Sequence, residues 1–100
     1  MQKLTNTQRD YLRREAHSLK PVVQIGKQGL TESVQASTEQ ALSARELIKI
    51  KFLDFRDQKQ ELAEDLAGAV GGVLISVIGN IAILYREQPD PAKRKLVLPG

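Results

Sequence analysis

Two glycines three residues apart, Gly26 and Gly29, separate an apolar run from a helix-start signal. The run is residues 21–25, and the signal is Thr31 followed by Glu32. Glycine adopts positive φ values easily and lets another group approach the backbone without a Cβ in the way. The first amides of a helix have no partner inside that helix. The junction therefore predicts a strand, a tight turn and a helix whose exposed amides suit a phosphate.

The two residues inside this turn are polar. Lys27 supplies a mobile charge, and Gln28 supplies both a donor and an acceptor. However, a chain of 100 residues with seven glycines produces some G-x-x-G spacings by chance. A plain strand-to-helix turn is therefore the alternative to a phosphate-binding loop.

Basic side chains gather around the glycine turn. Residues 1–29 carry six basic and two acidic side chains, residues 30–70 carry five and eight, and residues 71–100 carry four and two. The formal net charge of the chain is +3. This uneven distribution predicts a polyanionic partner for one face and a solvated acidic flank formed by the middle of the chain.

Length and composition predict one domain over residues 1–100, with a core over about residues 4–87 and a tail over 88–100. A chain that is 41% hydrophobic and 27% charged is typical of a folded globular protein. Because cysteine is absent, disulfides and thiolate chemistry are excluded, and zinc lacks its usual structural ligands. The first residues contain no apolar secretory segment, so we expect a cytoplasmic location.

Capping signals place three helices. Thr5 with Gln8 has capping-box spacing and predicts a helix over about 6–18, which Pro21 stops. Thr31 begins a second helix that runs to about residue 45 and has Thr38 on its apolar side. Near the end of the first helix, His17 either packs locally or contacts nucleic acid.

A third helix is predicted to begin at Asp57, with Gln60 as its capping partner, and to end at Gly71-Gly72. Its buried stripe is expected to consist of Leu62, Leu66, Ala69 and Val70.

Four strands complete the prediction. The first covers 22–25, and the second covers 47–52, where period-two alternation places Lys49 and Lys51 on the face opposite the apolar residues. Two further apolar runs, 73–78 and 81–85, flank Gly79-Asn80 and predict a β-hairpin. After a turn around 88–92, residues 93–98 form either a loose basic end or a docking segment.

One rival interpretation concerns residues 66–85, which contain no charged side chain and could by length alone form a membrane helix. The predicted helix stop and hairpin turn lie inside this span, and Asn80 would be placed in hydrocarbon. We therefore expect no membrane segment.

Several blocks, taken in order along the chain, carry a family resemblance. They are Leu12-Arg13-x-x-Ala16-His17-x-Leu19-Lys20-Pro21-Val22-Val23, Ile25-Gly26-Lys27-x-Gly29-Leu30-Thr31, Glu46-Leu47-Ile48-Lys49-Ile50-Lys51, Val77-Ile78-Gly79, Leu84-Tyr85-Arg86 and Lys95-x-x-Leu98-Pro99. Together they resemble the CRM domain (chloroplast RNA splicing and ribosome maturation) in its stand-alone bacterial, YhbY-like form.

The resemblance implies an α+β fold of order αβαβαββ, similar to the C-terminal domain of bacterial translation initiation factor three, with helices packed on one side of a mixed four-stranded sheet. It also implies RNA binding through a GxxG loop and association with precursors of the large ribosomal subunit. The residues that carry over as RNA-binding are Gly26, Lys27, Gln28, Gly29, Arg13, Lys20 and Arg86. The segment 52–55 departs from the family by being unusually apolar.

The sequence offers no convincing catalytic or metal-binding group, because it has one histidine, no cysteine and scattered acids. We expect no enzyme activity, no cofactor and no small-molecule substrate. Only four aromatic side chains are present, so recognition should rest on phosphates and backbone shape. The leading hypothesis is an RNA-binding factor in ribosome biogenesis. The alternative is a protein-docking adaptor that uses the loop and the Lys49/Lys51 face.

Overall fold

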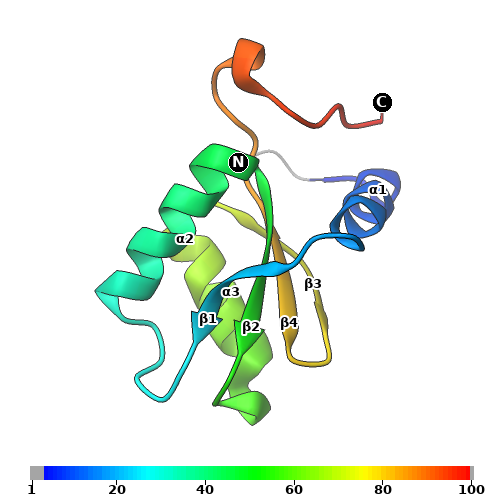
Figure 1. The fold of residues 1–100 in the computed structure, drawn as a ribbon. Coiled ribbons are helices and arrows are strands. Elements are labelled where there is room, and N and C mark those ends of the chain that lie inside the picture. Colours follow the sequence, from blue (N-terminus) through cyan, green and yellow to red (C-terminus); the bar gives the residue numbers. More distant parts are fainter. Residues whose placement is uncertain (1–3, 100) are drawn as a thin grey trace.

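A four-stranded mixed sheet forms the centre of the fold, and helices cover parts of both of its faces (Figure 1). The computed structural model describes residues 4–99, except for the side chain of Arg56. The elements in chain order are α1 (Asn6–Ala16), β1 (Pro21–Ile25), α2 (Glu32–Arg45), β2 (Leu47–Phe52), η1 (Arg56–Gln58), α3 (Lys59–Ala69), β3 (Val73–Ile78), β4 (Ile81–Tyr85) and η2 (Pro91–Lys93). The predicted order αβαβαββ is confirmed.

The strands lie in the order β1-β2-β4-β3. β1 runs parallel to β2, whereas β4 runs antiparallel to both β2 and β3. β1 and β2 therefore end at the same edge of the sheet as the hairpin turn between β3 and β4, while β4 ends at the opposite edge. The glycine turn that follows β1 lies at the first of these edges.

The two faces of the sheet carry separate cores. α2 and α3 pack on one face against residues that include Ile48, Ile50 and Phe52 of β2. α1 packs on the other face, where Leu12 and Ala16 meet Leu47, Ile83 and Tyr85, among others. The expectation that all helices lie on one side is therefore wrong for α1. The apolar stripe of α1 must be buried, and it packs against the odd-numbered residues of β2 and β4 at one end of the sheet.

Two helices begin as their sequences predict. Thr5 and Gln8 form a complete capping box, with the Gln8 amide 3.1 Å from Thr5 Oγ1 and the Thr5 amide 3.0 Å from Gln8 Oε1. The Oγ1 of Thr31 accepts from the Val34 amide at 3.1 Å. The hydroxyl of Thr38 is fully buried and is satisfied by the Val34 carbonyl at 2.8 Å, which explains a polar residue on an apolar stripe.

The start of the third helix differs from the prediction. Asp57 lies within η1, no side chain caps α3, and α3 begins at Lys59. The buried side of α3 includes Ala63, Leu66 and Ala67, and Ala69 is exposed. The capping pattern at Asp57 was misleading because a turn of 3-10 helix occupies these residues first.

The end of α3 and the hairpin agree with the sequence. Gly71 has a φ of +67°, and the Gly72 amide donates to the Ala67 carbonyl at 2.8 Å, as in a Schellman ending. β3 and β4 then pair as neighbours, with Gly79 at a φ of +58° in the turn between them. Residues 66–85 thus form a helix end and a hairpin, and no helix in the described residues is long and apolar enough to cross a membrane.

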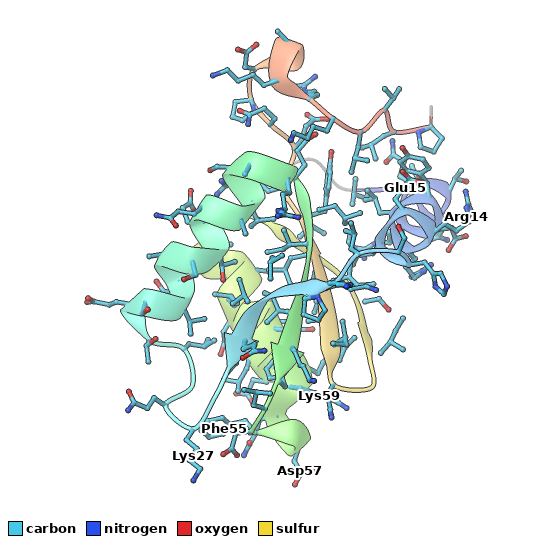
Figure 2. All side chains as sticks on the ribbon, viewed as in Figure 1. Arg14, Glu15, Lys27, Phe55, Asp57 and Lys59 are labelled. Carbon is cyan, nitrogen blue, oxygen red and sulfur yellow. The ribbon has the colours of Figure 1, made fainter. Side chains whose placement is uncertain are left out.

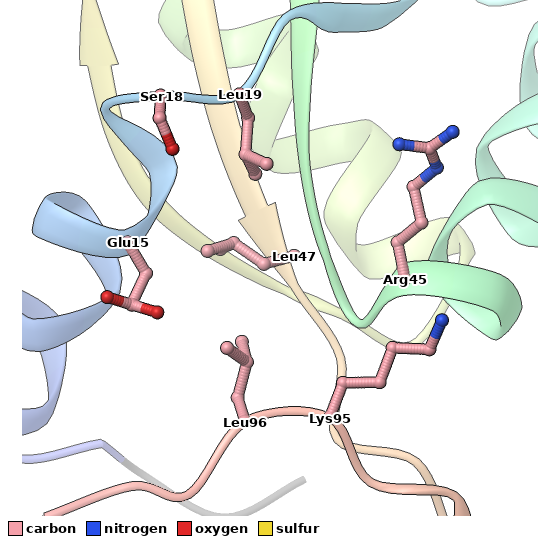
Figure 3. A pocket seen from close by; sticks show the side chains of 7 residues that line it. All are labelled: Glu15, Ser18, Leu19, Arg45, Leu47, Lys95 and Leu96. Atoms are coloured by element: carbon pink, nitrogen blue, oxygen red, sulfur yellow. The ribbon is translucent and has the colours of Figure 1, made fainter.

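The tail docks onto the domain instead of remaining loose. The carboxylate of Glu46, a buried residue, accepts from the backbone amides of Gln88 (3.0 Å), Lys95 and Leu96 (3.2 Å). Leu96 and Leu98 then pack beside α1. The tail closes one side of a pocket of about 310 Å³ between α1 and β2 (Figure 3). The pocket is lined by Glu15, Ser18, Leu19, Arg45, Leu47, Lys95 and Leu96.

Candidate nucleic-acid interface

The turn between β1 and α2 is held by its own backbone. The Gly29 amide donates to the Gly26 carbonyl at 3.0 Å, and the Thr31 amide donates to the Gly29 carbonyl at 3.1 Å. Gly29 has a φ of +71°, a conformation that favours glycine. A Cβ at Gly26 would meet no other group within 4 Å. The outer side of the turn is therefore open to an approaching ligand.

The backbone amides of this turn are available to bind an anion. Among residues 4–99, the amides of Lys27 and Gln28 donate to no protein acceptor. Both side chains are exposed, and the stick of Lys27 extends away from the ribbon (Figure 2). The N-terminus of α2 follows directly and adds the positive end of its dipole. We define residues 26–29 as the loop.

Phe55 supports the loop from behind. Its ring lies 3.7 Å from the position of a Cβ at Gly29, and its own backbone is left-handed, with a φ of +56°. The Asp54 carboxylate accepts from the Phe55 amide at 2.8 Å and favours this conformation. The apolar segment 52–55, which departs from the family resemblance, therefore packs locally against the loop.

A second group of cations lies on the sheet face that α1 partly covers. α1 presents Arg13, Arg14 and His17, which together line one shallow depression. β2 presents Lys49 and Lys51 on the same face, and Lys49 Nζ donates to the His17 carbonyl at 3.3 Å. We define the basic surface as Arg13, Arg14, His17, Lys49 and Lys51.

The register of the sheet connects the basic surface to the loop. Lys51 lies opposite Gln24 of β1, two residues before Gly26, and it is nearer the loop edge of the sheet than Lys49. Cationic side chains thus follow one another from α1 across β2 toward Lys27. The acidic residues of the helices lie mainly elsewhere, since α2 and α3 contribute five of them on the opposite face.

The predicted site residues do not all lie together. The four loop residues form one group, and Arg13 lies on the basic surface, where it pairs with Asp10 and is 39% exposed. Lys20 is exposed just before β1. Because the five residues of β1 span roughly 16 Å, Lys20 and the loop lie at opposite edges of the sheet.

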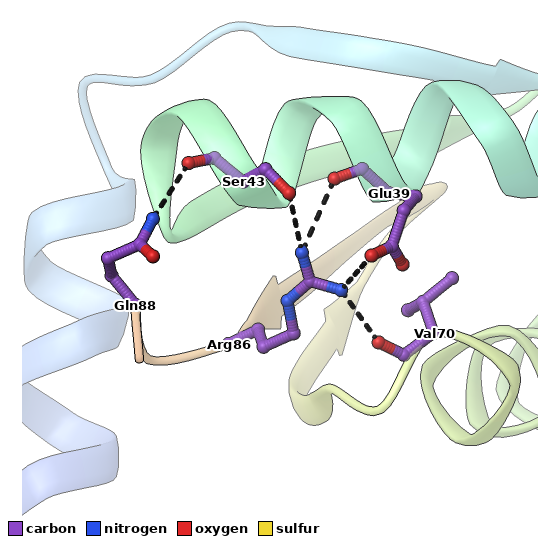
Figure 4. Close-up of polar contacts among 5 residues, drawn as sticks. All are labelled: Glu39, Ser43, Val70, Arg86 and Gln88. Atoms are coloured by element: carbon purple, nitrogen blue, oxygen red, sulfur yellow. Dashed lines mark hydrogen bonds and ion pairs between the residues drawn. The ribbon is translucent and has the colours of Figure 1, made fainter. Parts of the chain in front are cut away.

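Arg86 is placed apart from the loop and is held within the fold. It follows β4 at the edge opposite the loop, and its side chain is 19% exposed. Its guanidinium donates to Glu39 Oε1 (2.7 Å), the Val70 carbonyl (2.9 Å) and Ser43 Oγ (2.8 Å) (Figure 4). These bonds tie the end of β4 to α2 and α3. An RNA contact for Arg86 stays a prediction without support from this geometry.

Sequence reasoning missed one residue of the basic surface and assigned two others to a different function. Arg14 was not singled out, although it is one helical turn before His17 and both side chains are exposed. Lys49 and Lys51 were correctly placed on one face by their period-two spacing but were assigned to the docking alternative. Their proximity to α1 depends on the tertiary structure, because the sequence pattern does not show which face of the sheet α1 covers.

The chain is similar in sequence to a known protein family and to several known proteins. A model of the CRS1 / YhbY (CRM) domain matches residues 4–86. The chain belongs to this family. Over 91 residues it is 40% identical to the probable RNA-binding protein PA4753 of Pseudomonas aeruginosa, an alignment that covers 90% of this chain and 88% of the relative. It is 38% identical over 88 residues to the probable RNA-binding protein YqeI of Bacillus subtilis, covering 87% and 92% of the two chains.

A solved structure has the same fold. The solution structure of the hypothetical protein SAV1595 from Staphylococcus aureus has a TM-score of 0.81 and 40% sequence identity to this chain. The match covers 97% of this chain and all of the other. The expected α+β fold and family membership are confirmed.

Groups for metal or acid–base chemistry are sparse. In residues 4–99 no three His, Cys, Asp or Glu side chains cluster in a way that could hold a metal ion. What the arrangement offers a ligand is positive charge, backbone amides and shape, which is the chemistry of binding a polyanion.

Proposed function

We propose that this protein binds RNA through the loop and the basic surface. We further propose that it acts without catalysis, in the cytoplasm, in the assembly of the large ribosomal subunit. The observation that carries the proposal is the division of charge across the sheet. Cations from α1 and β2 face one side, and the acids of α2 and α3 face the other. Relatives named as RNA-binding proteins support RNA as the polyanion. The ribosomal assignment rests on the family resemblance alone.

Phosphates and backbone shape supply most of the proposed recognition. Lys27 and the loop amides can bind one phosphate at the α2 N-terminus, and the basic surface can bind neighbouring phosphates of the same strand. Arg13 must exchange its bond to Asp10 for a phosphate, whereas Lys51 and Arg14 make no ion pair within the described residues. Affinity should therefore fall linearly with the logarithm of salt concentration.

Gly26→Asp tests the loop with little effect on the fold. Gly26 has no positive φ, and a side chain there meets no neighbour within 4 Å, whereas Gly29 would be strained by any side chain. The carboxylate should repel the bound phosphate and weaken binding of structured RNA by about tenfold or more, the equivalent of one charge-assisted hydrogen bond. A filter-binding or anisotropy titration measures this change.

Gly68→Asp on α3 is the matched control. Gly68 is exposed, also has no positive φ and also has no neighbour within 4 Å of a Cβ, so the charge change is the same on the opposite face. Its affinity should stay close to that of the unchanged protein. Equal affinities for the two variants, both folded by circular dichroism, would remove the loop from the site.

The ribosomal part of the proposal needs its own experiment. The protein should co-sediment with precursors of the large subunit in a sucrose gradient, and RNase treatment should release it. Retention after complete RNA digestion would support the alternative, a protein-docking adaptor, because a contact with protein does not depend on intact RNA.

A further inference from the structure

The sheet face next to α1 has an apolar half beside its basic half. Ile78 of β3 is 60% exposed, which is unusual for isoleucine in a strand. It pairs directly with Ile81 of β4, which is only partly buried. The side chains of these residues share the face of Ile83 and Lys49, which pair with each other. α1 packs nearer the other end of the sheet, against Leu47 and Tyr85.

These residues line a groove. The groove has a volume of about 200 Å³ and is lined by Arg13, His17, Lys49, Ile78, Ile81 and Ile83. Three of its side chains are isoleucines, and the other three carry a guanidinium, an imidazole and an ammonium group. Across the sheet in register, Gln24, Lys51, Ile81 and Ile78 lie side by side on β1, β2, β4 and β3.

We infer that this groove binds one unpaired nucleobase of the RNA, an inference that rests on the proposed function. Neighbouring strands are about 4.8 Å apart, so Lys51 and Ile78 are separated by about 10 Å across the sheet. In this row of residues across the sheet, Lys51 can bind the phosphate of a nucleotide, and Ile81 and Ile78 can contact its base. A duplex keeps its bases stacked inside, so the groove favours a single-stranded or looped segment.

The charge of the groove favours a nucleotide over an apolar protein segment. None of the four strands carries an acidic residue, and no acidic side chain is among the described residues that line the groove. A purely apolar partner would bring Lys49, which makes no ion pair within the described residues, out of water without a counter-charge, and this is costly. A nucleotide brings its own anion.

Ile78→Lys separates a base contact from simple attraction between charges. If charge alone governed binding, an added lysine would strengthen it. We expect instead that affinity for a short single-stranded oligoadenylate falls roughly fivefold, because the apolar contact is lost. Val97→Lys is the control, since Val97 is 85% exposed in the tail and receives the same charge. Its affinity should be unchanged or slightly higher. Thermal unfolding verifies that both variants fold.

An abasic ribose-phosphate oligomer of the same length completes the experiment. Ile78→Lys should not weaken binding of this probe, because no base is present. The inference is overturned if Ile78→Lys binds the oligoadenylate as tightly as Val97→Lys, or if both probes weaken equally. It is also overturned if sedimentation shows that the unchanged protein dimerises and that Ile78→Lys makes it monomeric, since the occupant would then be a second copy. If the unchanged protein binds no RNA, the proposed function fails as well.

Discussion

Tyr85 combines deep burial with an unsatisfied hydroxyl. The residue is 1% exposed in the core under α1, and its hydroxyl has no hydrogen-bond partner among the described residues. Burial, with smaller contributions from Glu87 and Glu46, raises the pKa of Tyr85 to about 12 from its ordinary value of 10.0. The neutral phenol is therefore favoured in the folded chain, while the unfolded chain ionises at lower pH.

The variant Tyr85→Phe should be as stable as the unchanged protein at neutral pH, or more stable by about 1 kcal/mol, because an unpaired buried hydroxyl is removed. Ionisation of Tyr85 costs no stability below about pH 10, and stability is lost as the pH rises from there through about 12, because the unfolded chain ionises first. The variant should therefore keep more of its stability in this alkaline range.

Denaturant unfolding measures both effects, with Tyr11→Phe as the control. A loss of more than about 1 kcal/mol at neutral pH would show that the hydroxyl has a partner.

Three arginines have different roles in the fold, and the sequence alone does not distinguish these roles. Arg13 was predicted as a binding residue and lies half-exposed on the basic surface. Arg9 instead donates to the Leu74 and Ile75 carbonyls at a bulge in β3, at 3.1 and 3.4 Å. Arg86 bonds to the Val70 carbonyl. The acceptors of Arg9 and Arg86 are backbone oxygens that only the folded chain presents, so the sequence could not separate structural from exposed arginines.

Among the elements, the tail depends most on one distant residue. Glu46 ends α2 with a φ of +64°, a position that usually favours glycine. Its carboxylate accepts three amides of the tail, which is enough to offset a strain of about 1 kcal/mol. Local patterns predicted the strands, the hairpin and two helix starts, because those depend on neighbouring residues. They left the tail open, since its anchor lies about fifty residues away.

Glu46→Ala should release the tail. The Lys95 and Leu96 amides lose their acceptor, so their hydrogen exchange should become fast, and the domain should lose about 3 kcal/mol of stability. Glu87→Ala is the control, because Glu87 makes one partly exposed ion pair with Arg94, worth at most about 1 kcal/mol. Slow exchange at both amides in Glu46→Ala would show that Leu96 and Leu98 hold the tail without the carboxylate.

In the whole molecule, a sheet separates two unlike surfaces. α2 and α3 give one side an acidic exterior, whereas α1, β2 and the loop give the other side its cations. The charge counts along the chain predicted that such a division exists. They did not predict that α1 crosses to the other face of the sheet, because an amphipathic helix can pack on either face and its stripe does not say which. That placement joins Arg13, Arg14 and His17 to Lys49 and Lys51.

Ultraviolet crosslinking of the protein to RNA, followed by mass spectrometry of the crosslinked peptides, identifies which face of the protein binds RNA. We expect crosslinks in the loop, in the C-terminal half of α1 and at Lys49 to Lys51, and we expect these crosslinks to be lost at high salt because phosphate contacts dominate. Peptides of α2 after its first turn and of α3 serve as internal controls and should remain unmodified. Crosslinks confined to the α2–α3 face would show that RNA binds the other side of the sheet.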